Sequence, residues 1–388
     1  MELSKIAISL RPSATLKLNE LANRLKSEGK DIIHLGGGEP EFDIPELAIE
    51  ESLKKLKTKR VRYTPTSGTK DFKKVIANYC KEIYDFLPRE DNIVVSSGAK
   101  QCIYNFLMSC VNPGDEVLIM APYWVSYTEM VSMVYGIPVV LKPSKSLIPT
   151  LDEILSHTTS NTKAIMLNSP NNPSGLVYPD SLIENIVDYC SRNNIYILFD
   201  SIYDQLIIDD IKPKPPFSYM ENLNNSNIVV VNGVSKSFAM TGFRIGFSIA
   251  SNEISSAMAK IQAQITSCPS DISQSAATGA LKEGKIFIAK LVNDLRRKRD
   301  ILFEGISRIK KAKYIKSQAT FYSFIDFSEY ERDSEKLSST LIEKIGVVTV
   351  PGIEFGMDGY LRISFCTSDN DIRNGIERIR KFLDEGRL

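Results

Sequence analysis

The chain has 388 residues, more than one hydrophobic core usually supports, so we expect two domains. Its 48 basic and 47 acidic residues nearly cancel, which excludes a global attraction to nucleic acids or anionic membranes. The two histidines and six widely spaced cysteines leave little material for zinc clusters, Ser-His-Asp triads or a disulfide framework, so we expect no metal site. Because the sequence contains neither an N-terminal signal core nor an apolar run of about 18 residues, we expect a cytoplasmic protein.

The first predicted elements lead into a glycine-rich loop. An amphipathic helix up to about residue 25 and a strand at 31–35 precede residues 36–43, which read Gly-Gly-Gly-Glu-Pro-Glu-Phe-Asp. Three consecutive glycines let a ligand approach the backbone closely, although the pattern is not the dinucleotide-binding G-x-G-x-x-G and would also suit a flexible turn. A helix that begins near Pro45 and a loop around Tyr63 follow.

From about residue 91 the pattern becomes strand, loop and helix in repetition. The strand at 93–95 is followed by a small-residue loop at 96–100 and a helix at 101–110. Such a turn is a natural phosphate cradle, because unpaired backbone N–H groups and the helix dipole point out of it. The next strand, at 116–120, ends in a segment that contains Trp124, the one tryptophan of the chain.

Polar residues also follow the next two strands. The strand at 163–167 leads into residues 168–175, which read Asn-Ser-Pro-Asn-Asn-Pro-Ser-Gly. The apolar strand at 195–200 ends in Asp200, and Tyr203 lies three residues later. An acid in that position is costly to bury unless it is paired, so we expect Asp200 to face a cationic group.

The central stretch of the sequence is residues 228–246. An apolar strand at 228–231 carries Lys236 to the rim of the predicted sheet, where open α/β folds bind their ligands. A lysine amine there can form a Schiff base once burial or cationic neighbours lower its pKa. Arg244 can hold a phosphate through its fork of N–H donors. A surface lysine and an ordinary ion-pair partner are the alternative interpretations.

The last part of the sequence, from about residue 252, does not continue the strand–loop–helix repetition. Helices are predicted at about 252–264 and 271–283, and a long charged helix at about 286–311. Short strands at 321–327, 347–350 and 360–365 then alternate with helices. Arg362 lies on the last strand among apolar neighbours and needs an anionic partner, which is either a structural salt bridge or a bound ligand.

Several motifs together resemble one enzyme family. They are Arg-Pro-Ser-Ala-Thr at 11–15, Gly-Glu-Pro-x-Phe-Asp at 38–43, Ala-Pro-Tyr-Trp-Val-Ser-Tyr at 121–127, Asn-x-Pro-x-Asn-Pro-x-Gly at 168–175, Gly-x-Ser-Lys at 233–236 and Gly-x-Arg-Ile-Gly at 242–246. In this order they resemble the class I (fold type I) pyridoxal-phosphate-dependent aminotransferases, in the bacterial aspartate aminotransferase branch. The resemblance extends from residue 11 to residue 367.

The resemblance implies a fold and an assembly. It predicts an α/β protein with a large domain (41–285) that contains a mostly parallel seven-stranded sheet between helices. A smaller α+β domain would combine residues 1–40 with 286–388. The family also implies a homodimer in which Tyr63 crosses the interface to the neighbour's cofactor phosphate.

The resemblance assigns the cofactor contacts residue by residue. Lys236 would bind pyridoxal 5′-phosphate covalently, and Asp200 would face its ring nitrogen. Asn172 and Tyr203 would bind its 3-hydroxyl group, and Trp124 would stack on its ring. The remaining contacts, mostly on the phosphate side, would come from Gly98, Ala99, Lys100, Ser235 and Arg244.

For the substrate, the resemblance implies that Arg362, Asn172 and Gly38 hold the α-carboxylate. Lys100 would face a distal carboxylate, and Trp124 would line the same pocket. Ser201 departs from the more frequent glutamate after the aspartate, and no role is assigned to it.

The implied function is transamination of an amino acid, most simply aspartate, with 2-oxoglutarate by a ping-pong mechanism. Prephenate or an aromatic amino acid is the alternative substrate, and β-elimination or decarboxylation the alternative reaction. A non-enzymatic pyridoxal-phosphate-binding regulator is disfavoured, because the charge is balanced and no helix-turn-helix segment precedes the fold. We expect small-molecule substrates, no nucleic-acid partner and no membrane partner.

Overall fold

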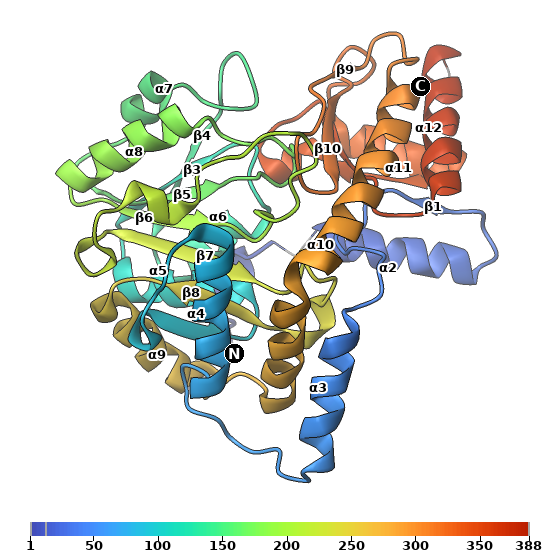
Figure 1. The fold of residues 1–388 in the computed structure, drawn as a ribbon. Coiled ribbons are helices and arrows are strands. Elements are labelled where there is room, and N and C mark those ends of the chain that lie inside the picture. The colour runs from blue at the N-terminus through green and yellow to red at the C-terminus, as the bar shows by residue number, and fades with distance from the viewer. Residues whose placement is uncertain (1, 12–13, 387–388) are drawn as a thin grey trace.

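The main element of the computed structural model is a seven-stranded sheet of order β2-β8-β7-β6-β5-β3-β4 (Figure 1). The structure describes residues 2–11 and 14–386, so Pro12 and Ser13 of the N-terminal motif lie outside the described residues. The strands are β2 (Ile93–Ser96), β3 (Glu116–Met120), β4 (Ile137–Leu141), β5 (Thr162–Asn168), β6 (Tyr196–Asp200), β7 (Ile228–Gly233) and β8 (Gly246–Ile249). Neighbouring strands pair in parallel except at β8, which is antiparallel to both β2 and β7. The predicted mostly parallel seven-stranded sheet is therefore confirmed.

Helices cover both faces of this sheet, because successive side chains of a strand point to opposite faces. In β7, Ile228 and Val230 belong to one buried hydrophobic cluster, whereas Val229 and Val231 belong to another. The first cluster includes residues of α4 (Lys70–Tyr84), α7 (Leu151–Ser156), α8 (Asp180–Arg192) and α10 (Asp271–Ile306). The second includes residues of α5 (Ala99–Cys110), α6 (Ser126–Met133) and α9 (Asn252–Ile265). The result is a three-layer α/β/α architecture.

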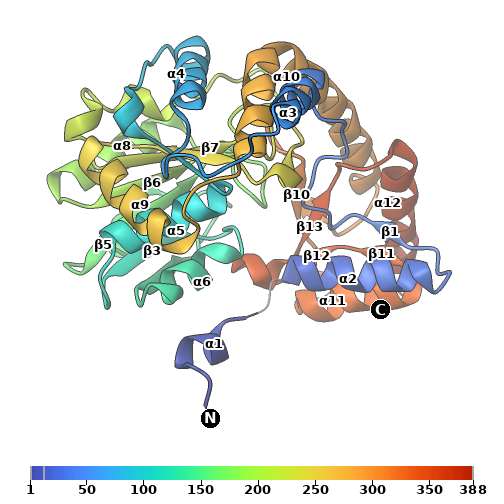
Figure 2. The same cartoon turned by 90° about the horizontal axis from the view of Figure 1, so that it is seen from below.

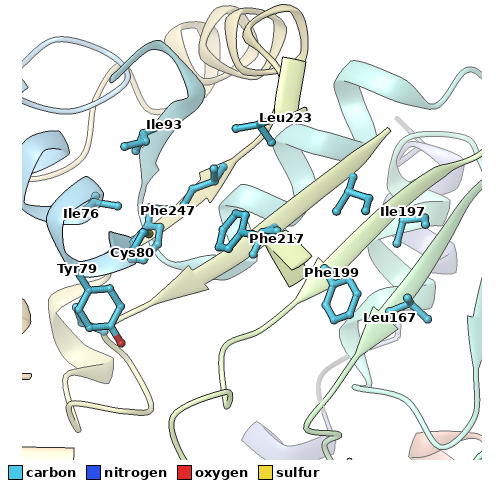
Figure 3. Packing of buried hydrophobic residues seen from close by; sticks show 14 of the residues in the cluster. Ile76, Tyr79, Cys80, Ile93, Leu167, Ile197, Phe199, Phe217, Leu223 and Phe247 are labelled. Carbon is cyan, nitrogen blue, oxygen red and sulfur yellow. The ribbon is translucent and has the colours of Figure 1, made fainter. Parts of the chain in front are cut away.

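Figure 3 shows the packing on the first face. Side chains of α4 such as Ile76 and Cys80 lie beside the strand residues Ile93 and Phe247. Each fully buried side chain of this size contributes roughly 1.5–3 kcal/mol of hydrophobic free energy. The strands read as continuous apolar runs because both of their faces are buried.

A smaller set of strands lies at the other end of the molecule (Figure 2). An antiparallel sheet has the order β12-β13-β10-β9, and β1 pairs in parallel with β11. These strands are β1 (Ile33–His34), β9 (Lys313–Tyr314), β10 (Tyr322–Asp326), β11 (Val347–Val348), β12 (Val350–Pro351) and β13 (Tyr360–Ser364). The remaining α-helices are α1 (Lys5–Ser9), α2 (Ala14–Ser27), α3 (Glu46–Lys57), α11 (Ser334–Ile345) and α12 (Asp369–Asp384). The short 3-10 helices are η1 (Glu90–Asn92), η2 (Pro216–Tyr219), η3 (Leu223–Asn225), η4 (Thr241–Phe243) and η5 (Gly352–Phe355). In the part of the chain that the structure describes, no helix is long and apolar enough to cross a lipid bilayer.

Helix α10 joins the two regions (Figure 1). The sequence predicts separate helices here, at about 271–283 and 286–311, and the structure agrees: α10 (Asp271–Ile306) consists of two helical parts joined across a kink at Gly284, where the backbone is non-helical. The residue lies next to the predicted boundary at 285/286, and the division into two domains stays a prediction.

The topology brings several loops to one edge of the main sheet. The parallel strands β2, β5, β6 and β7 all end at this edge. Strand β8 begins there because it runs in the opposite direction, and Gly246 pairs with both Ser96 and Gly233. Strand β3, which is parallel to β5 and leads to Trp124, ends there as well, so residues that follow five strands and precede a sixth meet in space.

Candidate active site

A cavity of about 660 Å³ lies at this edge of the sheet. Its lining includes eleven of the residues predicted from the sequence, Gly38, Ala99, Lys100, Trp124, Asn172, Asp200, Tyr203, Ser235, Lys236, Arg244 and Arg362. The structure therefore brings together groups that are up to 324 residues apart in the chain (positions 38 and 362). Most of these groups lie on loops that reach the same edge of the main sheet, whereas Gly38, after β1, and Arg362, on β13, are brought in from the two smaller sheets.

Lys236 lies three residues after the end of β7, and its amine points into the cavity. The Nζ atom donates a hydrogen bond to the carbonyl oxygen of Gly38 at 2.7 Å. The pKa of the Lys236 amine is lowered to about 8, chiefly by burial; the charge of Glu39 opposes this shift, and the charges of Arg362 and Arg244 add to it. A substantial fraction of this amine is thus neutral, and nucleophilic, at slightly alkaline pH.

Asp200 ends β6 and is 4% exposed. One carboxylate oxygen accepts a hydrogen bond from the Tyr127 hydroxyl at 2.5 Å, and the other accepts one from the backbone N–H of Ile202 at 3.2 Å. Burial raises the pKa of the Asp200 carboxyl to about 6, although both hydrogen bonds and the charge of Lys236 lower it. The carboxylate is therefore ionised at neutral pH only because these partners stabilise it.

Arg362, on β13, is 2% exposed. Its Nη1 donates to Oδ1 of Asn172 at 3.1 Å, and its Nη2 donates to the carbonyl oxygen of Gly36 at 3.0 Å. The guanidinium lies 4.3 Å from the ring centroid of Tyr322, and its buried Nε has no hydrogen-bond partner among the described residues. The hydrogen-bond partners of this buried cation in the described part of the chain are thus an amide and a carbonyl, not a carboxylate.

Asn172 connects this arginine to Tyr203. Its side-chain Nδ2 donates to the hydroxyl of Tyr203 at 3.4 Å, while Oδ1 accepts from Arg362. Its backbone N–H donates to Oδ1 of Asn168 at 2.9 Å. Burial raises the pKa of the Tyr203 hydroxyl well above its usual value, so this hydroxyl remains protonated and can donate a hydrogen bond.

A second part of the cavity wall is formed by the start of α5 and the turn before β8. Gly98 has φ of 89°, a left-handed conformation, and a Cβ atom there would lie 2.5 Å from Nη2 of Arg244. Arg244 is itself left-handed, with φ of 52°, and its Nη1 donates to the carbonyl oxygen of Thr241 at 2.8 Å. Only glycine at position 98 lets this guanidinium approach the N-terminus of α5 so closely. The two together present N–H donors and positive potential to an anion.

Lys100 and Trp124 form the outer part of the cavity. The Nζ atom of Lys100 lies 4.9 Å from the ring centroid of Trp124, a cation–π distance. Burial, and to a smaller extent the charge of Arg244, lowers the pKa of the Lys100 amine. The Trp124 ring packs edge-on against Tyr127.

Two predicted residues are not in the cavity lining. Gly98 lies directly behind it, against Arg244. Tyr63 is 90% exposed on the loop between α3 and α4. In a single chain Tyr63 is therefore a surface residue, and the proposal that it serves a second copy is argued below.

Sequence analysis missed the roles of Tyr127, Tyr322 and Asn168. Tyr127 is part of the recognised 121–127 motif, but an aromatic residue at the start of a helix is indistinguishable in sequence from an ordinary core residue. Tyr322 lies on β10 and contacts Arg362 only through the pairing of β10 with β13. Both contacts are long-range and leave no local pattern in the sequence.

Comparison with known proteins identifies the family that this site resembles. A family described as "Aminotransferase class I and II" matches residues 30–379. The aspartate/prephenate aminotransferase of Thermus thermophilus is 32% identical over 98% of this chain and 98% of its own length. The probable aspartate/prephenate aminotransferase of Aquifex aeolicus is 36% identical over 97% of each chain. The crystal structure of the Thermus thermophilus aspartate aminotransferase with maleate superposes with a TM-score of 0.94 at 32% identity, covering 99% of this chain and 100% of that one.

We predict that Tyr127→Phe raises the pKa of Asp200 above about 6, because the hydrogen bond that stabilises the carboxylate is lost. The pKa of Asp200 in the folded protein already exceeds the ordinary value of 3.8. The protonated carboxyl therefore stabilises the folded state relative to the carboxylate, and this stabilisation is lost as pH rises through the folded pKa. The free energy of unfolding should therefore fall by about 1.5–3 kcal/mol at pH 8 and by less at pH 5, where the carboxyl is protonated. Denaturant unfolding of the ligand-free protein at both pH values measures this.

The matched control for this prediction is Tyr196→Phe, at the opposite end of β6, whose cost should not depend on the protonation of Asp200. An equal loss of stability for Tyr127→Phe at pH 5 and pH 8 would contradict the prediction.

Proposed function

The chain belongs to the class I and II aminotransferases, and from this premise we propose that it is a pyridoxal-phosphate enzyme that transfers the amino group of aspartate to 2-oxoglutarate. The observation that carries the proposal is the position of Lys236. Its amine, with a pKa of about 8, shares one cavity with the buried carboxylate of Asp200 and with Arg362, a buried cation bonded to an amide and a carbonyl. A nucleophilic amine, an anion site and a buried acid are the groups that this chemistry requires.

The residues of the cavity fit pyridoxal phosphate. Gly98 leaves space that a Cβ atom would fill, next to the guanidinium of Arg244 and the N-terminus of α5, and Ser235 adds a hydroxyl donor; these groups would hold the phosphate. Asp200 would accept a hydrogen bond from the protonated ring nitrogen, which is the cationic group that this buried acid lacks. Asn172 and Tyr203 would bind the 3-hydroxyl, and Trp124 would pack on the ring.

When bound, pyridoxal phosphate supplies an aldehyde that condenses with amino groups and a ring that withdraws electrons from the attached carbon. Lys236 then has two tasks in this chain. Its Nζ would hold the cofactor's aldehyde carbon in the resting state, and as a free neutral amine it would accept the proton of the substrate Cα and donate it to that cofactor carbon. Such general acid–base transfer is worth roughly 10²–10⁴-fold in rate. A second oxo acid reverses the sequence, which gives ping-pong kinetics.

Binding of the amino acid is assigned to Arg362, Asn172 and the backbone of Gly38. Arg362 supplies a buried guanidinium with an unpaired Nε, to which an α-carboxylate would bind with charge-assisted hydrogen bonds. Lys100, at the outer part of the same cavity, would supply a second cation for the distal carboxylate of a dicarboxylic substrate. These two cations favour aspartate and glutamate over neutral amino acids.

Prephenate is the second candidate substrate. Two relatives, from Aquifex aeolicus and Thermus thermophilus, are described as acting on aspartate and prephenate. Prephenate also carries two carboxylates, so Lys100 suits it as well. Half-reaction rates distinguish the two, and formation of pyruvate or carbon dioxide in place of a new amino acid would indicate elimination or decarboxylation.

The protein is proposed to act as a homodimer to which Tyr63 contributes across the interface. Tyr63 is 90% exposed, and it continues an apolar stripe on α3 and the following loop. The stripe consists of Ile49, Leu53, Leu56 and Val61, which are 38–49% exposed. An exposed row of this kind is typical of a surface covered by a second protein. A tyrosine hydroxyl at its end would complete the phosphate site of the neighbouring chain.

We predict that Lys236→Ala abolishes transamination, to below about 10⁻⁴ of the wild-type rate, because both the covalent link and the proton carrier are lost. Borohydride reduction of the wild-type protein with pyridoxal phosphate should label Lys236. It should leave Lys73 unlabelled, since this buried lysine also has a lowered pKa but is bonded to Ser67 and Glu90 outside the cavity. Retained turnover in the variant, or labelling elsewhere, would overturn the proposal.

We also predict that Lys100→Met raises the KM for aspartate and glutamate by about tenfold or more, because a charge-assisted contact to the distal carboxylate is lost. The KM for alanine or phenylalanine should change by less than about twofold. The change in absorbance on adding each amino acid to the cofactor-loaded enzyme gives the half-reaction rates. Equal losses for all donors would show that Lys100 does not select the substrate.

A mixed dimer tests Tyr63. If Tyr63 of one chain completes the site of the other, a hybrid of a Tyr63→Ala chain with a Lys236→Ala chain contains one wild-type site. Reassortment of the two variants should then restore high-affinity cofactor binding in about one quarter of all sites, the statistical share. If Tyr63 acted within its own chain, no site would be restored.

A further inference from the structure

One tripeptide contacts both the proposed nucleophile and the proposed carboxylate-binding arginine. The carbonyl oxygen of Gly38 accepts the hydrogen bond from Lys236 at 2.7 Å, and the carbonyl oxygen of Gly36 accepts one from Nη2 of Arg362 at 3.0 Å. The orientation of the loop at 36–38 therefore bears on the position of both cations. Since its three residues are glycines, no side chain of its own fixes the loop.

His34 holds this loop from the preceding strand. Its Nδ1 accepts a hydrogen bond from the backbone N–H of Gly36 at 3.3 Å. The regular pairing ends just before, where Leu35 donates to Val348 and accepts from Ser364. The imidazole is thus the group that extends the ordered backbone one residue beyond the strand.

The fit between the ring and the loop is close. A Cβ atom at Gly36 would lie 3.5 Å from Cε1 of His34 and 3.3 Å from a methyl group of Val350. The glycine therefore leaves only enough space for the imidazole on one side and the valines of β11 and β12 on the other. The N–H of Gly36 lies in the peptide plane shared with Leu35, and its carbonyl lies in the plane shared with Gly37, so a small change in the φ or ψ angle of Gly36 would redirect the carbonyl that Arg362 contacts.

We propose that His34 is a positioning residue for substrate binding. Its unprotonated Nδ1 anchors Gly36 on the N–H side, which limits the φ and ψ angles of this glycine and keeps its carbonyl where it holds Arg362 in the orientation that binds the α-carboxylate of the amino acid. This inference rests on the proposed function of Arg362. His34 itself contacts neither the cavity nor the reacting atoms.

The surroundings of His34 keep the ring neutral. Burial lowers the pKa of the imidazole below its ordinary value of 6.5; a hydrogen bond to the backbone of His34 itself opposes this shift, and the positive charges of Lys26 on α2 and Arg362 on β13 add to it. Strand β11 presents Val348 on the other side of the loop. Helix α12 packs against Ile33, whose side chain points to the opposite face of the strand. Protonation at acidic pH would place a hydrogen on Nδ1 and remove the acceptor for Gly36.

Three substitutions of His34 distinguish a role of the hydrogen bond between Nδ1 and Gly36 from a role of the side chain in packing alone. In His34→Asn, the side-chain oxygen occupies the place of Nδ1 and accepts the same hydrogen bond without titrating. In His34→Gln the oxygen is displaced towards the position of Nε2, and His34→Leu has no acceptor. We expect the Asn variant to keep the wild-type KM for the amino acid, while the Gln and Leu variants raise it about three- to tenfold with kcat within about twofold.

The pH profile is the second readout. The wild-type KM should rise as pH falls below about 6.5, as the acceptor is protonated, and His34→Asn should lack this component. His157→Asn is the control, since His157 is the other histidine of the chain and its Nδ1 bonds to the carbonyl of Glu153. That variant should reproduce the wild-type profile.

The third readout needs no activity. The backbone amide resonance of Gly36 should titrate with the pKa of the His34 ring in the wild-type protein, and should not titrate in His34→Asn. A Gly36 amide that ignores His34, or equal KM values for the Asn, Gln and Leu variants, would overturn the inference. If the wild-type protein transaminated no amino acid, the proposed function would fail while the amide titration still tested the contact.

Discussion

The properties of the cavity depend on one physical constraint, the free-energy cost of removing ionisable side chains from water at the end of a buried sheet. Strands β6 and β7 are buried on both faces, and each delivers a charged residue, Asp200 or Lys236, to the point where the hydrophobic packing stops. Burial shifts both pKa values towards neutrality, the acid up to about 6 and the amine down to about 8. The same burial that stabilises the sheet thus prepares a base and an acid whose protonation can change near physiological pH.

Arg362 is also a buried ionisable group, but here burial determines the partners of the charge and does not neutralise it. Its guanidinium remains charged, so its burial is compensated by dipoles: the amide of Asn172, the carbonyl of Gly36 and the face of Tyr322. Neutral partners of this kind leave the charge available, whereas a carboxylate partner would compete with an anionic ligand. Incomplete pairing of the Arg362 guanidinium costs stability, but it leaves a charge to which an anionic ligand could bind.

Glycines allow these charged groups to approach the backbone. Gly98 admits Arg244 to the N-terminus of α5, and the loop at 36–38 lets Lys236 and Arg362 bond directly to its carbonyl oxygens. In both places the missing side chain is replaced by a polar contact from a distant part of the chain. Long-range hydrogen bonds therefore hold the backbone at 36–38, where the glycines themselves constrain it least.

The sequence by itself determined the strand–loop–helix order, and its resemblance to a known family determined the seven-stranded sheet and eleven of the residues that line the cavity. The strand–loop–helix order follows from local patterns, since an apolar run that ends in Asp200 or leads to Lys236 is visible without knowledge of the rest of the chain. Only the tertiary structure decided that Tyr127 donates to Asp200, that Arg362 bonds to an amide and a carbonyl, and that His34 holds Gly36. The contacts of Tyr127 and Arg362 depend on the distance between segments far apart in the sequence, and such distances are set by packing, which leaves no periodic signal in the order of the residues. The contact of His34 with Gly36 is local, but it depends on side-chain and backbone torsion angles that the order of the residues does not reveal.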